Sequence, residues 1–256
     1  MVNNIDINSL MLIFCTLFFC IISLVIMSVD IRKNPLKKRV KQSVAIDSTD
    51  SSVKDAPELS GDPDKSIAEN SNIFTPGIVA YCILMIIATI GIALMMIFVY
   101  KDNEMLFSLK RLCLLSVMWP IALIDAKSYR IPNLFIIYGL VLRVVVFVFE
   151  LIGNGSGIKY TLLSEGLAVG ALLIVSVLCA ILIKNSIGFG DIKLFVVMGL
   201  FLGMEGIWSS MFASLIVSFV VSVFCLITKK KSRKDSIPFG PALVFGTYLS
   251  VFLTGM

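Results

Sequence analysis

The sequence predicts an all-α polytopic membrane protein with about eight transmembrane helices and a disordered cytoplasmic loop after the first helix. Two observations predict this class. Hydrophobic residues make up 58% of the 256 residues and charged residues only 15%, whereas a soluble domain carries about a quarter charged residues. The apolar residues also form long runs rather than the alternation of an amphipathic helix or strand, as expected of segments that face lipid.

Eight apolar runs are expected to span the bilayer. They cover residues 10–29, 78–100, 106–124, 134–152, 162–183, 192–203, 207–227 and 237–253. The first run has no basic residue before it and no small-x-small cleavage pattern after it, so it is expected to remain as a helix rather than be removed as a signal peptide. The sixth run has only 12 residues and ends at Gly203. It is too short to cross alone, so it either starts within the preceding polar turn or is a half-helix, and seven spans are the alternative count.

Three parts are expected along the chain: an N-terminal transmembrane helix (1–29), a polar loop (30–73) and a membrane-embedded domain (74–256). The loop opens with basic residues from Arg32 to Lys41, which are expected to bind anionic lipid headgroups. It then becomes acidic and polar. Residues 42–72 contain too few apolar residues to build a core, so they are predicted to be disordered.

Basic residues predict the orientation in the membrane. If the N-terminus lies outside, the cytoplasmic segments hold 17 of the 22 Lys and Arg residues, and four lie at the outer ends: Lys101, Lys110, Arg111 and Lys159. Because cytoplasmic loops are enriched in Lys and Arg, this asymmetry predicts an outside N-terminus. The remaining residue, Arg143, lies within a span and needs a partner there, for which Glu150 and Glu165 are candidates.

Several functional classes are not expected. The chain has no histidine, and its six cysteines lie inside apolar runs without forming a C-x-x-C pair. A metal site and a disulfide framework are therefore not predicted. No pattern of interleaved aromatic and basic residues suggests a nucleic-acid partner. No cofactor is expected.

Two carboxylates lie where apolar runs meet the predicted cytoplasmic boundary. Asp125 ends the run L-L-S-V-M-W-P-I-A-L-I-D, and Asp191 begins the run D-I-K-L-F-V-V-M-G-L. A charged, unpaired carboxylate in hydrocarbon costs about 3 kcal/mol on insertion scales. One interpretation is structural: Asp191 caps the sixth helix, and Lys127 and Lys193 are ion-pair partners.

The other interpretation is catalytic. Two neighbouring carboxyl groups share one proton, so that the ionised group can take a proton from water while the protonated group polarises a scissile carbonyl. The surrounding residues favour this interpretation. Gly188 and Gly190 remove two Cβ atoms beside Asp191, which lets a substrate backbone come close or permits an unusual turn. Pro132 and Asn133 mark the start of the next helix.

Three motifs in order resemble those of type IV prepilin peptidases, the Gly-x-Gly-Asp membrane aspartic peptidases. The motifs are I-D-A-K-S-Y-R-I-P-N (124–133), G-F-G-D-I-K (188–193) and I-P-F-G-P (237–241), and the resemblance covers about residues 105–245. In that family one catalytic aspartate lies seven residues before a proline, as Asp125 precedes Pro132. The second follows Gly-x-Gly, as Asp191 does.

This resemblance implies eight membrane helices and an active site on the cytoplasmic side of the bacterial plasma (inner) membrane. It implies substrates that are prepilin-like single-span membrane precursors, whose short basic leader is cut after a glycine. It makes Pro238, Gly240 and Pro241 neighbours of the substrate, although a plain helix-start signal explains them equally well. Lys193 is expected near Asp191, where it stabilises the charged acid or anchors a helix end.

The chain departs from the family pattern in two places. Many bacterial members carry a four-cysteine zinc-binding loop after the first helix and methylate the new N-terminus with S-adenosylmethionine. Here that loop has no cysteine, so peptidase activity without methylation is expected. Asn133 stands where several members have aspartate. Lys127 and Arg130 are expected to be solvated among the lipid headgroups.

Two other functions compete with a peptidase. An ion or proton-coupled transporter would place its acidic residues near the bilayer midplane, often between inverted repeats. Both acids are instead predicted at one membrane face, and no internal repeat is detected. A non-catalytic pilus-assembly scaffold would have no need of two aspartates in these motifs, and both are present.

Overall fold

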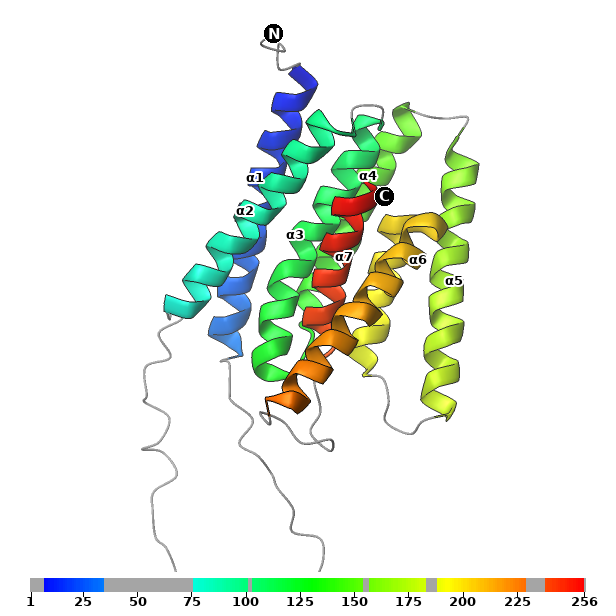
Figure 1. Ribbon diagram of the computed structural model, residues 1–256. Helices are drawn as coiled ribbons and strands as arrows, with labels where there is room; N and C mark the ends of the chain where they lie inside the picture. The colour runs from blue at the N-terminus through cyan, green and yellow to red at the C-terminus, as the bar shows by residue number, and fades with distance from the viewer. Residues whose placement is uncertain are drawn as a thin grey trace, which may run out of the picture.

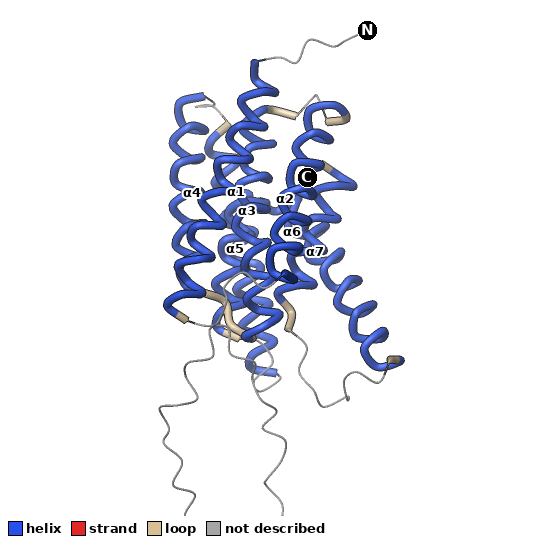
Figure 2. The backbone as a smooth tube through the Cα atoms, turned by 90° about the vertical axis from the view of Figure 1, so that its left-hand side faces the viewer, coloured by secondary structure: helices blue, strands red, loops and turns tan. Residues whose placement is uncertain are grey.

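The computed structural model describes residues 7–34, 76–100, 103–153, 157–182, 188–228 and 238–255. Seven α-helices make up the regular structure of these ranges (Figure 2): α1 (Ile7–Lys33), α2 (Pro76–Phe98), α3 (Met105–Ser128), α4 (Asn133–Gly153), α5 (Ile158–Leu182), α6 (Phe189–Ile227) and α7 (Gly240–Thr254). Six are long and apolar enough to cross a membrane, and α7 is shorter, with 15 residues.

The protein is therefore an all-helical integral membrane protein, as its composition predicts. The count of about eight spans and the cytoplasmic position of the loop remain predictions. The segment predicted to be disordered, 42–72, lies outside the described residues. Helix α1 continues to Lys33, past the predicted end of the first span at residue 29.

Helix α3 is the centre of the bundle. It contacts α1, α2, α4, α6 and α7, and its residues 108–125 are all buried. Figure 1 shows it between the pair α1 and α2 on one side and α6 on the other. Burial on all sides explains its composition: a helix shielded from lipid tolerates polar residues such as Lys110, Arg111 and Ser116 if neighbouring helices pair them.

Pro120 lies inside α3, where it has no N–H to donate to the carbonyl four residues earlier. That carbonyl belongs to Ser116. It accepts a hydrogen bond of 2.6 Å from the hydroxyl of Ser23 in α1, which is fully buried. The side chain of a neighbouring helix thus replaces the missing donor, as the lack of water in a bilayer requires.

Helix α6 consists of two arms joined at Gly203. This glycine has φ 64° and ψ −175°, a conformation that residues with a Cβ atom avoid. Figure 1 shows the chain reversing here: the first arm (189–202) rises from the lower end and the second (204–227) returns toward it. The arms correspond to the predicted runs 192–203 and 207–227. The first arm begins at Phe189, so this helix does start within the preceding polar turn.

The second arm of α6 packs against α7 through small polar residues. Ser210 and Thr247 share a hydrogen bond of 2.7 Å, and the hydroxyl of Ser214 donates to the carbonyl of Leu243 at 3.1 Å. A Cβ atom on Gly246 would collide with the backbone of Ser214. Small residues that let helix backbones approach closely are typical of contacts between membrane helices.

We call the end of the bundle where α3 ends and α6 and α7 begin the aspartate end, which is the lower end in Figure 1. The end where α3 begins and α6 reverses is called the opposite end. The chain alternates between the two ends, so residues far apart in sequence meet at each of them.

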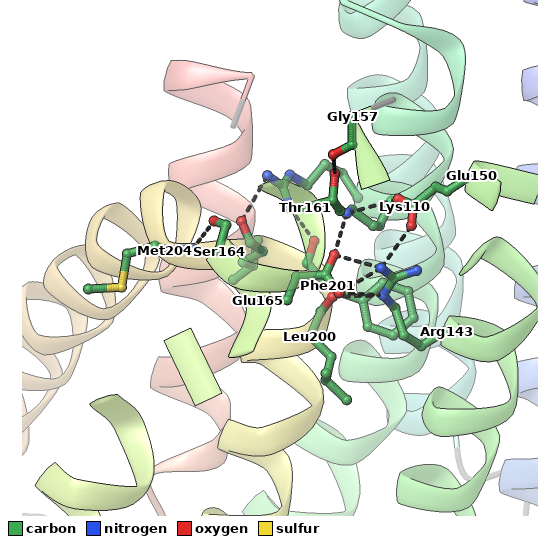
Figure 3. A network of polar contacts seen from close by, with 12 residues as sticks. Lys110, Arg143, Glu150, Gly157, Thr161, Ser164, Glu165, Leu200, Phe201 and Met204 are labelled. Atoms are coloured by element: carbon green, nitrogen blue, oxygen red, sulfur yellow. Dashed lines mark hydrogen bonds and ion pairs between the residues drawn. The ribbon is translucent and has the colours of Figure 1, made fainter. Parts of the chain in front are cut away.

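Four charged side chains form a buried network toward the opposite end (Figure 3). Lys110 binds Glu165 at 2.7 Å and Glu150 at 3.0 Å, while Arg143 binds Glu165 at 2.6 Å and Glu150 at 2.8 Å. Two cations and two anions thus neutralise each other away from water. Glu150 and Glu165 are the predicted candidates for Arg143, and both are confirmed as its partners.

Lys110 and Arg111 are predicted at an outer helix end, and the side of the membrane on which they lie stays a prediction. Both are buried inside the bundle, with 7% and 3% of their surface exposed. In the sequence they resemble flanking charges because they lie within two turns of the start of α3. The structure supplies their partners from α4, α5 and α6, which permits burial.

Candidate active site

Asp125 lies in the last turn of α3, at the aspartate end, and is 7% exposed. Its Oδ2 atom accepts a hydrogen bond of 2.9 Å from the backbone N–H of Gly240, the first residue of α7. A backbone N–H at a helix start is a favourable partner for a carboxylate because it lies at the positive end of the helix dipole. Helix α7 thus fixes the orientation of this side chain.

Gly240 has no room for a side chain. A Cβ atom there would lie 2.6 Å from Oδ2 of Asp125 and 3.1 Å from both its Cβ and its Cγ. The glycine is needed for this close approach rather than for an unusual backbone conformation, because it lies at the start of a regular helix. The third predicted motif therefore contacts the first predicted aspartate directly.

Asp191 lies in the first turn of α6, also at the aspartate end. Its Oδ2 atom accepts a hydrogen bond of 3.3 Å from the N–H of Gly188, the residue that precedes the helix. The predicted helix-capping role of Asp191 is confirmed by this contact. The first turn of α6, which holds Asp191, lies at the end of the bundle where the last turn of α3 holds Asp125, so capping and a shared site are compatible.

The connection between α3 and α4 contacts Asp125 and packs beside the glycine that precedes Asp191. Tyr129 follows α3 in a left-handed conformation, with φ 50°, and its N–H donates to the carbonyl of Asp125 at 2.8 Å. Two residues later is Ile131, and a Cβ atom added to Gly190 would lie only 3.1 Å from the Cβ atom of Ile131. The glycine beside Asp191 therefore permits close packing of this connection. The sequence alone does not distinguish this role of the glycine from a role in the approach of a substrate.

A pair of charges anchors the same connection to α1. Arg130 binds Asp30 at 2.8 Å and donates to the carbonyl of Asn34 at 3.0 Å. The expectation that Arg130 is solvated among headgroups is therefore wrong: its side chain is 31% exposed and has a buried partner. Sequence reasoning misses Asp30 because it places the end of the first helix at residue 29, and the longer helix carries this acid into the bundle.

The other predicted supporting residues lie at or near helix ends. Lys193 donates to the side-chain oxygen of Asn133 at 3.0 Å, and both residues are exposed, so this contact links the starts of α6 and α4. Lys127 is exposed, as expected of a residue at the membrane boundary. Pro238 and Pro241 are half-buried around Phe239, whose ring packs edge-on against Phe195 of α6 at 6.3 Å. Gly188 has an ordinary extended backbone, with φ −76° and ψ 145°.

The fold and this site define a class of protein: an integral membrane helix bundle with two carboxyl groups, from different helices, at one of its ends. The sequence model of the type IV leader peptidase family matches residues 112–227. This stretch contains most of α3, all of α4 and α5 and both arms of α6, and it holds both aspartates.

A relative from Bacillus subtilis (strain 168), named prepilin leader peptidase/N-methyltransferase, is 30% identical over 83 residues. The aligned part makes up 32% of this chain and 33% of the relative, so the chain matches about a third of that relative's length. No solved structure matches the chain. Through residues 112–227 the chain is therefore similar to the type IV leader peptidase family.

Proposed function

We propose that this protein is a membrane aspartic endopeptidase that uses Asp125 and Asp191 to cleave the leader from prepilin-like precursors. One observation carries the proposal. Two carboxyl groups that are 66 positions apart in the sequence (191 − 125) lie at the same end of the bundle, and each has one oxygen bound by the N–H of a glycine from a predicted motif. Their position at the same end of the bundle supports their action as a pair.

In this mechanism the pair holds a single proton. The ionised carboxylate takes a proton from water, and the resulting hydroxide attacks the scissile carbonyl carbon while the protonated carboxyl group donates to the carbonyl oxygen. The tetrahedral intermediate then collapses, the C–N bond breaks and the departing nitrogen takes a proton from the pair. Oδ2 of each aspartate is held by a backbone N–H, so in our proposal the Oδ1 atoms share the proton. Neither aspartate is assigned as the permanent base, because the two titrate together.

The proposed substrates are single-span precursors with a short basic leader ahead of an apolar helix. The similarity to the type IV leader peptidase family supports this substrate class. A site at the end of a membrane bundle suits such a precursor, because its apolar helix can remain in lipid while the leader reaches the boundary. We propose that this boundary is the cytoplasmic face of a bacterial plasma membrane with the N-terminus outside. The 17 basic residues in the predicted inside segments support that orientation.

We further propose that the protein does not methylate the new N-terminus. The named relative carries both activities in its name, but the loop after the first helix of this chain has no cysteine for a zinc site. Incubation with a precursor and S-adenosylmethionine, followed by mass spectrometry of the product, tests this point. We expect a product without the added mass of a methyl group, and a methylated product would overturn the expectation.

The central test is leader removal from a precursor in reconstituted vesicles. Asp125→Asn and Asp191→Asn are each expected to abolish cleavage, because an amide cannot share or transfer the proton. Glu104→Gln is the matched control: it makes the same change from acid to amide at an exposed residue beside the start of α3, at the opposite end, and is expected to cleave normally. Full cleavage by either aspartate variant contradicts the proposal. Ion flux that depends on Asp191 would favour the transporter.

A further inference from the structure

The reversal of α6 leaves backbone groups without their helical partners. Since Gly203 departs from helical geometry, the carbonyls just before it lose the N–H donors that a continuous helix would supply. In a membrane bundle such groups need a partner, because an unsatisfied one costs several kcal/mol in hydrocarbon. Three neighbouring helices supply these partners.

Two arginines bind three successive carbonyls at the end of the first arm. Arg111 of α3 donates through Nη1 to Phe201 and through Nη2 to Leu202, the latter at 3.1 Å. Arg143 of α4 donates to Leu200 at 2.8 Å. Beyond the break, the N–H of Met204 donates to the hydroxyl of Ser164 in α5 at 2.9 Å. Figure 3 shows Arg143 beside Leu200, and Ser164 beside Met204.

Arg111 is built into this position. It is 3% exposed, and its guanidinium lies 4.4 Å from the centre of the Phe107 ring. A Cβ atom on Gly206, in the second arm, would lie 3.2 Å from its Nη2 atom, so the glycine leaves the space that the guanidinium fills. A planar group with two parallel donors suits two neighbouring carbonyls in a way that the single ammonium of lysine does not.

The two helices that Arg111 joins are the ones that carry the proposed catalytic pair. Asp125 lies 14 residues further along α3 (125 − 111), which is about 21 Å at the rise of an α-helix. Asp191 lies ten residues before Phe201 in the first arm of α6 (201 − 191), which is about 15 Å. We infer that Arg111 is a positioning residue. It fixes the position of the first α6 arm along the axis of α3, and hence the distance between the two carboxyl groups.

This inference rests on the proposed function, but it concerns a residue far from the reacting atoms. Lys110, the preceding residue, provides the comparison. It is also a buried cation of α3, yet its partners are Glu150 and Glu165 on α4 and α5. Loss of Lys110 removes a buried charge without releasing the first arm of α6, so it reports the cost of disturbing the charged network alone.

The experiment compares Arg111→Met with Lys110→Met in the full chain. Spin labels at Ala126 and Phe189, two exposed residues at the end of α3 and the start of α6, are attached through a genetically encoded keto amino acid so that the native cysteines stay in place. Pulsed electron resonance then gives the distribution of distances between the labels. Cleavage kinetics and their pH dependence are measured on unlabelled protein.

For Arg111→Met we expect a shifted or broadened distance distribution and a fall in kcat of about tenfold to a hundredfold, because a displacement of about 1 Å in an active site has that effect. KM should change little. The bell-shaped pH profile should narrow, because carboxyl groups that lie further apart share a proton less strongly. Lys110→Met should keep the wild-type distribution of label distances and the wild-type width of the pH profile, even if the variant protein is less stable.

A wild-type distance distribution in Arg111→Met overturns the inference, as does a lower kcat with an unchanged profile width. If Arg111→Met does not fold, Arg111→Lys and Gly203→Ala test the same contact between α3 and the reversal of α6. Both should show the same changes in distance distribution, kcat and profile width, at smaller amplitude. The distance measurement needs no cleavage. Failure of the proposed function, seen as full cleavage by Asp125→Asn, is therefore distinguishable from failure of this inference.

Discussion

Gly240→Ala tests whether α7 holds Asp125 in a working position. The added methyl group would lie 2.6 Å from Oδ2 of Asp125, against about 3.3 Å for an ordinary contact between carbon and oxygen. Relief of this overlap of about 0.7 Å requires either a turn of the Asp125 side chain or a tilt of α7. Both lengthen the 2.9 Å hydrogen bond from the Gly240 N–H.

The expected cost has two parts. Overpacking of a buried site costs about 1 to 3 kcal/mol, and loss of a hydrogen bond to a charged group costs about 1.5 to 3 kcal/mol. Because the strain falls on a proposed catalytic side chain, kcat for leader cleavage should fall about tenfold to a hundredfold. The assay is single-turnover cleavage of a precursor in vesicles, with thermal unfolding measured on the same preparations.

Gly91→Ala is the matched control. Gly91 lies within α2, and a Cβ atom there would meet nothing within 4 Å. The same substitution should therefore leave cleavage unchanged and raise stability by about 0.5 to 1 kcal/mol, since alanine favours a helix interior more than glycine. Wild-type cleavage by Gly240→Ala would refute the reasoning that links α7 to Asp125.

Three further predictions concern the supporting structure. Arg130→Ala should destabilise the protein by about 1 to 3 kcal/mol in thermal unfolding, because it leaves the buried Asp30 without its partner; restoration of stability by Asp30→Asn in the same chain checks the cause, and a neutral single variant contradicts it. Gly246→Ala should yield far less folded protein than Gly91→Ala in size-exclusion chromatography, because the backbone of Ser214 occupies the required space; equal yields would count against this packing. Asn133→Asp should keep cleavage close to wild type, since its contact with Lys193 is exposed and such pairs contribute about 0 to 1 kcal/mol; a loss of more than tenfold would require another role.

Features that depend on local composition can be predicted from the sequence. Long apolar runs identify the helices, and the position of both aspartates at run ends indicates that they lie at the same end of the bundle. The Gly-x-Gly-Asp string and the I-P-F-G-P string are also informative, because the structure places Gly188 and Gly240 in hydrogen bonds with the two acids.

Features that depend on contacts between distant helices could not be predicted. Lys110 and Arg111 resemble flanking charges, because nothing in a single sequence shows that α3 is enclosed by its neighbours. The pairing of Asp30 with Arg130 joins residues 100 positions apart, and no local pattern marks it. Gly203 signals the end of an apolar run, but its role in reversing α6 depends on donors from three other helices.

A double-mutant comparison tests most directly whether Asp125 and Asp191 act as one unit. Single-turnover cleavage rates are measured for the wild type, for each Asp→Asn variant and for the variant that carries both substitutions. Residues that act together show strongly non-additive losses. We therefore predict that each single change lowers the rate as far as the double change does. A single variant that cleaves clearly faster than the double variant, or losses that multiply in the double variant, would contradict the account.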